Sequence, residues 1–427
     1  MSELQAERAA PAEPTAPVAF LRRQLRETHV QLLASQLLTG GVALIANVLM
    51  ARALSPTGRG EVALILQLVY LGTQLLLLGT ERSFMAACHG TAPAAGLRAY
   101  ARLLIVPATV GLAAAAAFAA LAPQRYHPGT DVVLLIACYA LVEAAMLGTR
   151  AIAVATDRMG DFLWARVAET LLLFGLLVAL FAVDVADPAV WILAYLVAGL
   201  VPTVAQVATW LRLPARPGEA PIAPEQQRLV RREGLALFPA ALSNMAMLRA
   251  DRLALPALAS TAALGLYASV ATMTELLAWP LRAYADAKLG QWRAAHRDGS
   301  LNARPLILAA AVYALVVTPL MAGGMYLLIV PVFGERYAAA KVLVLPLVVA
   351  AGLYAVSRIC LGVLIARGRG GLVSAAEIAG FAASFAGYLL LIPPYGILGA
   401  AYGSLIGYGA CLLFAVVAGR VTAREAA

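Results

Sequence analysis

Nine ionisable side chains fall inside long apolar runs of this sequence. They are Glu143, Arg150, Glu169, Arg249, Asp251, Arg252, Glu275, Arg358 and Glu377. A charged side chain near the centre of a bilayer costs about 2.5–3.5 kcal/mol on the insertion scale, so nine of them cannot all face lipid. We therefore expect these groups to face a shared polar interior, either as ion pairs or in contact with water.

Arginine is the residue of this set whose chemistry is most specific. Its guanidinium group stays protonated and presents a planar fork of N–H donors that matches the oxygens of a phosphate group. We expect four arginines to bind a phosphate group in a central cavity and to pass it from one face to the other: Arg249, Arg282, Arg358 and Arg150.

The other polar groups of these runs are expected to line the same cavity or to bind a coupling cation. They are Asn47, Glu143, Glu169, Asp251 and Glu275. Arg150 follows Glu143 by seven residues and Arg282 follows Glu275 by seven, so each pair lies on one helix face and predicts local charge pairing. In an alternative interpretation, the charges pair across helices and only fix the packing of a bundle, while side chains near helix ends reach the interface.

Residue types that serve enzymes and metal sites are few and scattered. The four cysteines (Cys88, Cys138, Cys360 and Cys411) are far apart, and the four histidines lie at or near predicted loops or helix ends. No pair has the spacing of metal ligands or of a redox motif. We expect no catalytic residues, no metal and no cofactor, so the sequence does not predict an enzyme.

The composition requires lipid around the chain. Of 427 residues, 62% are hydrophobic and only 13% are charged, whereas a soluble domain is closer to half apolar and a quarter charged. The net charge of +9 does not indicate nucleic-acid binding, because the basic residues lie between the apolar runs, as in a membrane topology signal.

Apolar runs divided by charge, glycine and proline predict an all-α membrane protein of about twelve transmembrane helices. The predicted helices are 30–52, 61–87, 99–122, 131–156, 161–183, 188–211, 234–256, 262–286, 305–331, 340–366, 372–392 and 396–419. Arginine and lysine concentrate in alternate connections, so both termini are expected in the cytoplasm.

The two halves of the sequence look related, which predicts two pseudo-symmetric six-helix bundles around a central cavity. An Ala-Leu pair followed by Ser, Thr and Gly comes after the first predicted helix (53–60) and again after the seventh (257–265). The predicted organisation is a disordered cytoplasmic tail (1–27), an N-terminal lobe (28–212), a cytoplasmic linker (213–232), a C-terminal lobe (233–420) and a cytoplasmic tail (421–427).

Four segments resemble motifs of the Wzx-type polysaccharide flippases, which share a superfamily with the multidrug and toxic-compound extruders. Residues 47–60 (NVLMARALSPTGRG) are similar to a stretch after the first helix of that family. Residues 250–268 contain an Asp followed by Gly-x-Tyr, residues 332–337 read VFGERY, and residues 394–401 read PYGILGAA. The resemblance covers roughly residues 28–420.

This resemblance implies a lipid-linked oligosaccharide flippase that works by alternating access. The implied substrate is an undecaprenyl-pyrophosphate-linked glycan, moved from the inner to the outer leaflet of a bacterial cytoplasmic membrane during cell-surface polysaccharide biosynthesis. The implied partners are this lipid-linked glycan, H⁺ or Na⁺ as a coupling ion, and a glycan polymerase and glycosyltransferases encoded nearby. The family lines its cavity with basic residues, whereas here the polar group deep in the first helix is Asn47.

Other functions stay open on the sequence alone. A cation-coupled multidrug antiporter of the sister family is the main alternative, although arginines in a pocket of low dielectric constant repel cations. A membrane glycosyltransferase, polymerase or ligase needs a larger outer loop or an acidic catalytic motif, and a scaffold has no use for charges inside the membrane.

Overall fold

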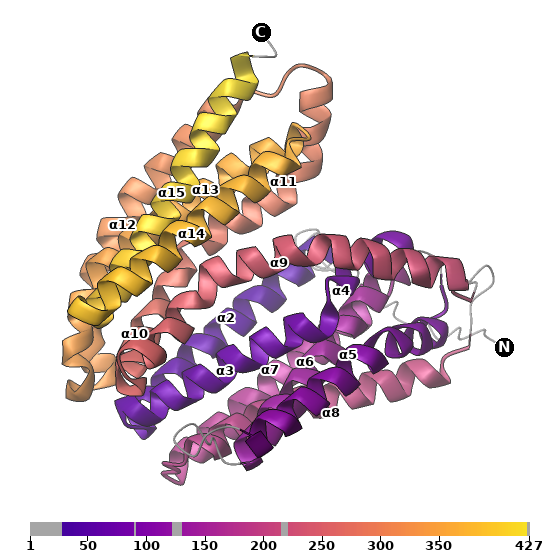
Figure 1. Ribbon diagram of the computed structural model, residues 1–427, viewed down its shortest axis with the longest axis horizontal. Helices are drawn as coiled ribbons and strands as arrows, with labels where there is room; N and C mark the ends of the chain where they lie inside the picture. The colour runs from indigo at the N-terminus through magenta and orange to yellow at the C-terminus, as the bar shows by residue number, and fades with distance from the viewer. Residues whose placement is uncertain (1–27, 89–90, 122–129, 215–220, 425–427) are drawn as a thin grey trace, which may run out of the picture.

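The computed structural model describes residues 28–88, 91–121, 130–214 and 221–424, and its regular elements there are helices (Figure 1). In chain order they are α2 (Thr28–Ala53), α3 (Pro56–Leu77), α4 (Thr80–Ala87), α5 (Pro93–Leu121), α6 (Thr130–Ala155), α7 (Met159–Ala182), α8 (Pro188–Arg212), α9 (Pro224–Leu258), α10 (Thr261–Thr274), η2 (Glu275–Leu277), α11 (Trp279–Arg297), α12 (Ala303–Phe333), η3 (Glu335–Leu343), α13 (Val344–Ala366), α14 (Gly370–Tyr395) and α15 (Ile397–Arg424).

Within these ranges, nine helical segments are long and apolar enough to cross a membrane, or ten if the bent pair of α10–η2 and α11 counts as one span. This confirms a multi-pass all-α membrane protein. Two further helices are as long as these segments: α2 has 26 residues and α9 has 35, and α9 carries Arg249, Asp251 and Arg252 within its C-terminal half.

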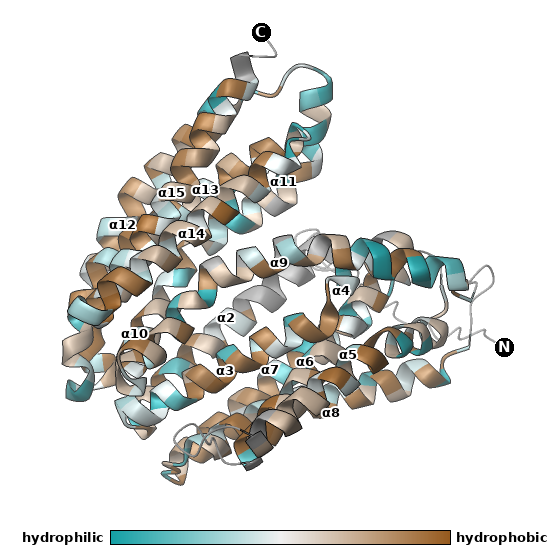
Figure 2. Cartoon of the chain, in the orientation of Figure 1, coloured by the Kyte–Doolittle hydropathy of each residue, from teal (hydrophilic) through white to brown (hydrophobic). Residues whose placement is uncertain are grey.

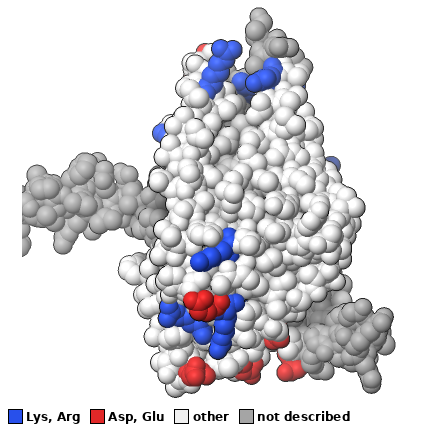
Figure 3. All heavy atoms as spheres, turned by 90° about the vertical axis from the view of Figure 1, so that its left-hand side faces the viewer, with Lys and Arg blue, Asp and Glu red and all other residues white. Residues whose placement is uncertain are grey.

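Hydrophilic and hydrophobic residues are separated along the helices. Figure 2 shows hydrophilic residues concentrated at one end of α9 and of α11, while most other helices are hydrophobic along their length. On the face shown in Figure 3, charged side chains gather near the top and in the lower part and leave a broad uncharged surface between them. An apolar band bounded by charge is what a bilayer requires of a protein surface.

The described side chains form two separate hydrophobic cores. One contains residues between Ala46 and Val230, with Trp191 and Leu177 fully buried. The other lies almost wholly between Leu255 and Ala418 and takes only Ala51 and Ala63 from the first half of the chain. Each half of the sequence therefore buries most of its apolar surface within itself.

The two halves meet closely where α3 crosses α10. A Cβ atom added to Gly60 would overlap the carbonyl oxygen of Thr261, and a Cβ atom added to Gly265 would overlap that of Pro56. The contact is reciprocal, because each glycine receives a backbone oxygen from the start of the other helix. The two glycines belong to the stretches 53–60 and 257–265, whose likeness predicted related halves.

Both helices at this crossing are interrupted further along. After α3 the chain turns at Leu78 and Gly79, whose φ angles are 49° and 73°, before α4 begins. After α10 a 3₁₀ turn at Glu275–Leu277 precedes α11, and the helix bends by 43°. The second and eighth predicted spans are thus each broken, and the second break leaves the carboxylate of Glu275 at a point where the helix is not continuous.

Several predicted boundaries differ from the structure. The predicted tail 1–27 lies outside the described residues, as do residues 215–220 of the predicted linker. The rest of that linker is not a loop throughout, because α9 begins at Pro224 with proline in its first turn and includes the cluster Arg228–Arg232. Helix α15 continues to Arg424, so part of the predicted terminal tail is helical.

The close crossing of α3 and α10 predicts that alanine at Gly60 destabilises the protein, whereas alanine at Gly41 does not. We expect Gly60→Ala to lower the melting temperature of the purified chain in detergent, since displacing the α3–α10 contact costs about 1–3 kcal/mol. Gly41→Ala is the matched control: a Cβ atom there meets open space, and the exchange should leave stability unchanged or raise it by about 0.5–1 kcal/mol. Equal melting temperatures for the two variants would contradict this interpretation of the crossing.

Candidate functional site

The charged centre of the structure is the carboxylate of Glu275, which pairs with two arginines of α9. Arg249 donates from Nη1 to Oε1 of Glu275 at 2.9 Å and from Nη2 to Oε2 at 3.3 Å. Arg252 also donates to Oε1. The Arg252 side chain is 9% exposed, whereas those of Arg249 and Glu275 are 27% and 38% exposed. Two guanidinium groups share one carboxylate, so one positive charge of this trio is not balanced within it.

Asp251, beside Arg252 in α9, belongs to a buried network of hydroxyl groups. Its Oδ2 accepts a hydrogen bond from the Tyr267 hydroxyl at 2.6 Å, and its Oδ1 accepts one from the backbone N–H of Arg252 at 2.8 Å. The Ser404 hydroxyl lies 3.2 Å from that of Tyr267 and 2.9 Å from that of Tyr388. The network joins α9, α10, α14 and α15 and gives the buried carboxylate the partners that it needs.

A third buried group connects the two halves near the α3–α10 crossing. Arg59 is 4% exposed and donates from Nη2 to Asn47 Oδ1 at 2.8 Å, while Asn47 Nδ2 donates to the Ser269 carbonyl oxygen at 2.9 Å. The Nε and Nη1 atoms of Arg59 have no hydrogen-bond partner among the described residues. The Arg59 guanidinium also interacts electrostatically with Arg252. Arg59 thus adds a buried guanidinium group near Arg252, and none of the ion pairs found in the described residues includes it.

The first half of the chain contributes its own charged cluster. Arg166 pairs with Glu169, three residues along α7, and donates to the sulfur of Met146 at 3.2 Å. Glu143 of α6 interacts electrostatically with both members of this pair. The cluster thus joins α6 and α7.

Tyr70 of α3 lies between this cluster and the arginines of α9. Its ring is within 5.8 Å of the Arg249 guanidinium, and its hydroxyl interacts electrostatically with Glu143, Arg166 and Glu275. The side chain is nonetheless 48% exposed. An exposed side chain that is influenced by charges of both halves indicates one polar space between them, which is where a ligand can be reached from either half.

A further ion pair lies within the second half. Arg358 of α13 donates to Glu377 of α14 at 3.2 Å, with the two side chains 17% and 11% exposed. The guanidinium carbon of Arg358 also lies 5.5 Å from the centre of the Tyr354 ring. This pair connects two packed helices, in agreement with the alternative interpretation of the sequence in which charges fix bundle packing.

The two predicted pairings at seven-residue spacing are wrong. Glu275 pairs with Arg249 and Arg252 because it lies at the break between α10 and α11, before the helix that carries Arg282. Glu143 is placed near Arg166 and Glu169, not near Arg150. Arg150 and Arg282 are both exposed and make no ion pair within the described part of the chain. Their predicted role as phosphate ligands stays a prediction.

Four residues of this region were not among the predicted site residues. Arg166 lies within the predicted span 161–183 and had the same signal as the other charges inside apolar runs. Arg59 was predicted to lie in an outer loop. It lies instead in the first turn of α3, which Ser55 caps by accepting a hydrogen bond from the backbone N–H of Gly58. Tyr267 was noted only as part of the Gly-x-Tyr motif, and Tyr70 carried no signal by itself, since tyrosine is common at helix positions near an interface.

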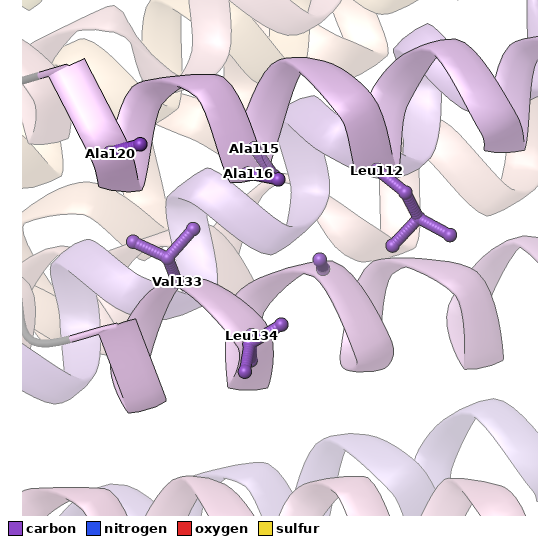
Figure 4. A pocket seen from close by; sticks show the side chains of 7 residues that line it. Leu112, Ala115, Ala116, Ala120, Val133 and Leu134 are labelled. Atoms are coloured by element: carbon purple, nitrogen blue, oxygen red, sulfur yellow. The ribbon is translucent and has the colours of Figure 1, made fainter.

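Apolar grooves on the molecule differ in what they offer a ligand. Figure 4 shows one of about 250 Å³ between α5 and α6, lined by Leu112, Ala115, Ala116, Ala120, Val133, Leu134 and Ala137. Its walls are hydrocarbon throughout, so nothing in it orients a polar substrate. A second groove of about 390 Å³ runs along α9 and includes Arg249 in its lining. Of the two, only the second connects with the charged centre.

Glu275 is expected to hold the two arginines of α9 in place. Glu275→Gln leaves both guanidinium groups without their shared carboxylate, and we expect it to reduce the free energy of unfolding by about 1–3 kcal/mol, less than for a fully buried pair because the site is partly exposed. Thermal unfolding in detergent measures the change, and Glu233→Gln, an exposed carboxylate of α9, is the control.

The pair itself is isolated by a double variant. Arg249→Gln together with Glu275→Gln should cost less than the two single changes added together. If the two single changes in the free energy of unfolding add up to that of the double variant, the contact between Arg249 and Glu275 does not contribute to stability.

No protein-family model and no curated protein matches the sequence. The fold, by contrast, is similar to solved transporters. It matches the inward-facing conformation of a multidrug resistance MATE family transporter of the MOP superfamily with a TM-score of 0.68 and 17% identity, over 89% of this chain and 93% of that one. It matches the lipid II flippase MurJ in an inward closed conformation with a TM-score of 0.65 and 10% identity, over 90% and 86% of the two chains.

A third similar structure is a MOP superfamily transporter from Pyrococcus furiosus, described as having a binding pocket of reversed polarity. Its TM-score is 0.55 at 17% identity, over 96% of this chain and 98% of that one. Identities this low establish the fold and leave the substrate open. The chain therefore has the membrane-transporter fold that MATE transporters and the MurJ flippase share.

Proposed function

We propose that this protein is a flippase for a lipid-linked oligosaccharide, moving an undecaprenyl-pyrophosphate-linked glycan from the inner to the outer leaflet. The observation that carries the proposal is the pairing of Arg249 and Arg252 with the single carboxylate of Glu275, next to an apolar groove. A pyrophosphate needs several N–H donors and positive charge, and a lipid needs apolar surface beside them. Fold similarity to the MurJ flippase supports the same class of substrate.

In the proposed mechanism, the pyrophosphate accepts some of the hydrogen bonds that the two guanidinium groups otherwise donate to the Glu275 carboxylate. Arg249 is the accessible member and makes first contact, while the more deeply buried Arg252 holds Glu275 in position. Arg59 adds positive charge from the opposite half. Arg358, Arg150 and Arg282 are proposed as secondary phosphate contacts at other levels of the passage, and Asn47, Glu143, Glu169 and Asp251 as polar lining or coupling-ion groups.

Movement of the substrate is proposed to follow alternating access between two lobes of six spans each. One set of contacts between the lobes lies at the ends of α2, α3, α10 and α12, where Arg52 donates to the carbonyl oxygens of Val332 and Pro331 at 2.7 and 2.6 Å. Similarity to the inward-facing MATE transporter exceeds that to an outward-facing one, with TM-scores of 0.68 and 0.58. These contacts are accordingly assigned to a closed outer side.

The cellular setting follows from this proposal. The chain is placed in a bacterial cytoplasmic membrane with both termini in the cytoplasm, because its basic connections are those expected to stay inside. Its proposed partners are the lipid-linked glycan, H⁺ or Na⁺, and the polymerase and glycosyltransferases of the same pathway.

The second candidate is a cation-coupled multidrug antiporter. Its support is the fold similarity to MATE transporters together with the buried carboxylate of Asp251, which is held by two hydrogen bonds. A cationic drug that approaches the accessible Arg249 meets a trio of two guanidinium groups and one carboxylate, and their repulsion is poorly screened in a site of low dielectric constant. The flippase is therefore favoured.

Export should depend on Arg249 more than on other arginines of the same helix. We expect Arg249→Gln to reduce glycan export at least tenfold at unchanged protein level, because a charged contact to the pyrophosphate contributes about 1.5–3 kcal/mol. Arg231→Gln, an exposed change on α9, should export normally. Export that survives neutralisation of Arg249, Arg282 and Arg358 together excludes this model, and drug resistance that depends on the gene favours the antiporter.

The hydrogen bonds of Arg52 between the lobes should stabilise the conformation in which the outer side is closed. Because Arg52 is exposed, removing its two hydrogen bonds by Arg52→Gln is worth about 1 kcal/mol, or about a fivefold shift in population. Spin labels at cysteines replacing Glu61 and Glu335, both exposed near this contact, report the separation of the lobes. A larger fraction of long distances is expected in the variant, and an unchanged distribution would refute the assignment.

A further inference from the structure

An open groove follows α9 from Leu242 to Leu258. At 1.5 Å per residue these sixteen steps extend about 24 Å, which exceeds the roughly 15 Å of hydrocarbon in one leaflet. Its floor includes Ala246, Ala250 and Ala254, spaced four residues apart and so aligned on one face of the helix. A second row of α9 side chains lies beside these alanines in the groove lining: Met245, Arg249, Leu253 and Ala257.

Large side chains from other helices form the walls of this channel. They include Leu71 of α3 and two residues of α14 that are one helical turn apart, Phe381 and Phe385. Phe385 is 45% exposed, so the channel is open along its rim. In a bilayer, this rim offers a sideways entrance for a hydrocarbon chain that remains attached to a group inside the protein.

One residue of the groove lining is charged. Arg249 lies among the apolar lining residues and also belongs to the trio with Arg252 and Glu275. The groove and the charged centre are therefore continuous through one side chain. A ligand that fits both has a multiply charged anionic head and one long apolar chain.

We propose that this groove holds the isoprenoid chain of the lipid-linked substrate while its pyrophosphate lies against Arg249. The inference rests on the proposed function and adds to it the path of the lipid. A polyprenyl pyrophosphate joins one long apolar chain to a multiply charged head group, which matches an apolar groove whose one charged lining residue is Arg249. Throughout transport, the chain stays in the bilayer along α9 and only the head group and glycan cross the polar space.

The test compares two probes on the purified full-length chain in detergent: undecaprenyl phosphate, which has the chain, and inorganic pyrophosphate, which has none. Ala254→Phe places a bulky ring on the channel floor away from Arg249. We expect it to weaken binding of undecaprenyl phosphate about tenfold and to leave the binding of pyrophosphate unchanged. Ala311→Phe is the matched control on an exposed face of α12 and should bind both probes like the parent chain.

A second variant covers the case in which Ala254→Phe does not fold. Phe385→Ala removes an exposed wall of the channel and is expected to weaken undecaprenyl phosphate selectively. Full affinity for undecaprenyl phosphate in the folded variants overturns the proposal. The proposal is also overturned if phosphatidylglycerol binds with the same affinity as undecaprenyl phosphate and is weakened equally by the variants, because the groove is then a general lipid contact.

The two levels of the proposal fail separately. Loss of chain-dependent binding in Ala254→Phe, combined with glycan export that is unchanged when the gene is deleted, supports the groove and rejects the flippase function. A parent chain that does not bind undecaprenyl phosphate, combined with export that requires Arg249, rejects the groove and supports the function.

Discussion

The contact of two guanidinium groups with one carboxylate is the interaction around which the site is arranged. A charge in hydrocarbon costs several kcal/mol, so Arg249 and Arg252 are tolerated only because Glu275 meets them from the break after α10. The bend that follows Glu275 turns α11 and Arg282 away, so the two arginines of α9 meet this carboxylate. Local interruption of a helix and pairing of charge are thus two parts of one solution.

The same constraint explains why α9 is unusual among the helices of this chain. With 35 residues it is long enough to cross a bilayer, and it carries Arg249, Asp251 and Arg252 among apolar residues. One of its faces contributes Asp251 to the hydroxyl network, another contributes Arg249 to the charged trio, and a row of alanines forms the floor of an apolar groove. A helix surrounded by protein, polar space and lipid in turn cannot be uniformly hydrophobic.

Contacts between the halves are of two physical kinds. At the crossing of α3 and α10, Gly60 and Gly265 permit backbone-to-backbone approach, a close fit that a single added carbon disrupts. Around it, hydrogen bonds from Asn47 and Arg52 reach carbonyl oxygens of the other half, where they can exchange for water. Each half keeps its own apolar core, so separating these contacts need not unfold either one. Such a division suits a protein whose halves move as units.

The sequence by itself determined that the chain is a multi-pass helical membrane protein and that its internal charges need a common polar environment. Both conclusions follow from the transfer cost of apolar and charged groups, which depends on composition and order along the chain. The likeness of residues 53–60 and 257–265 also marked the two stretches that cross. Asp251, Arg249 and Glu275 were named from their positions in apolar runs alone.

Only the tertiary structure decided which charges meet. Spacing along a helix favoured Arg282 as the partner of Glu275, but a bend of 43° between them and the approach of α9 selected Arg249 and Arg252 instead. Tyr70 and Arg59 became part of the site through contacts with distant helices, which no local pattern contains. Pairing is a matter of distance in space, and local sequence constrains that distance only over the few residues of an unbroken helix.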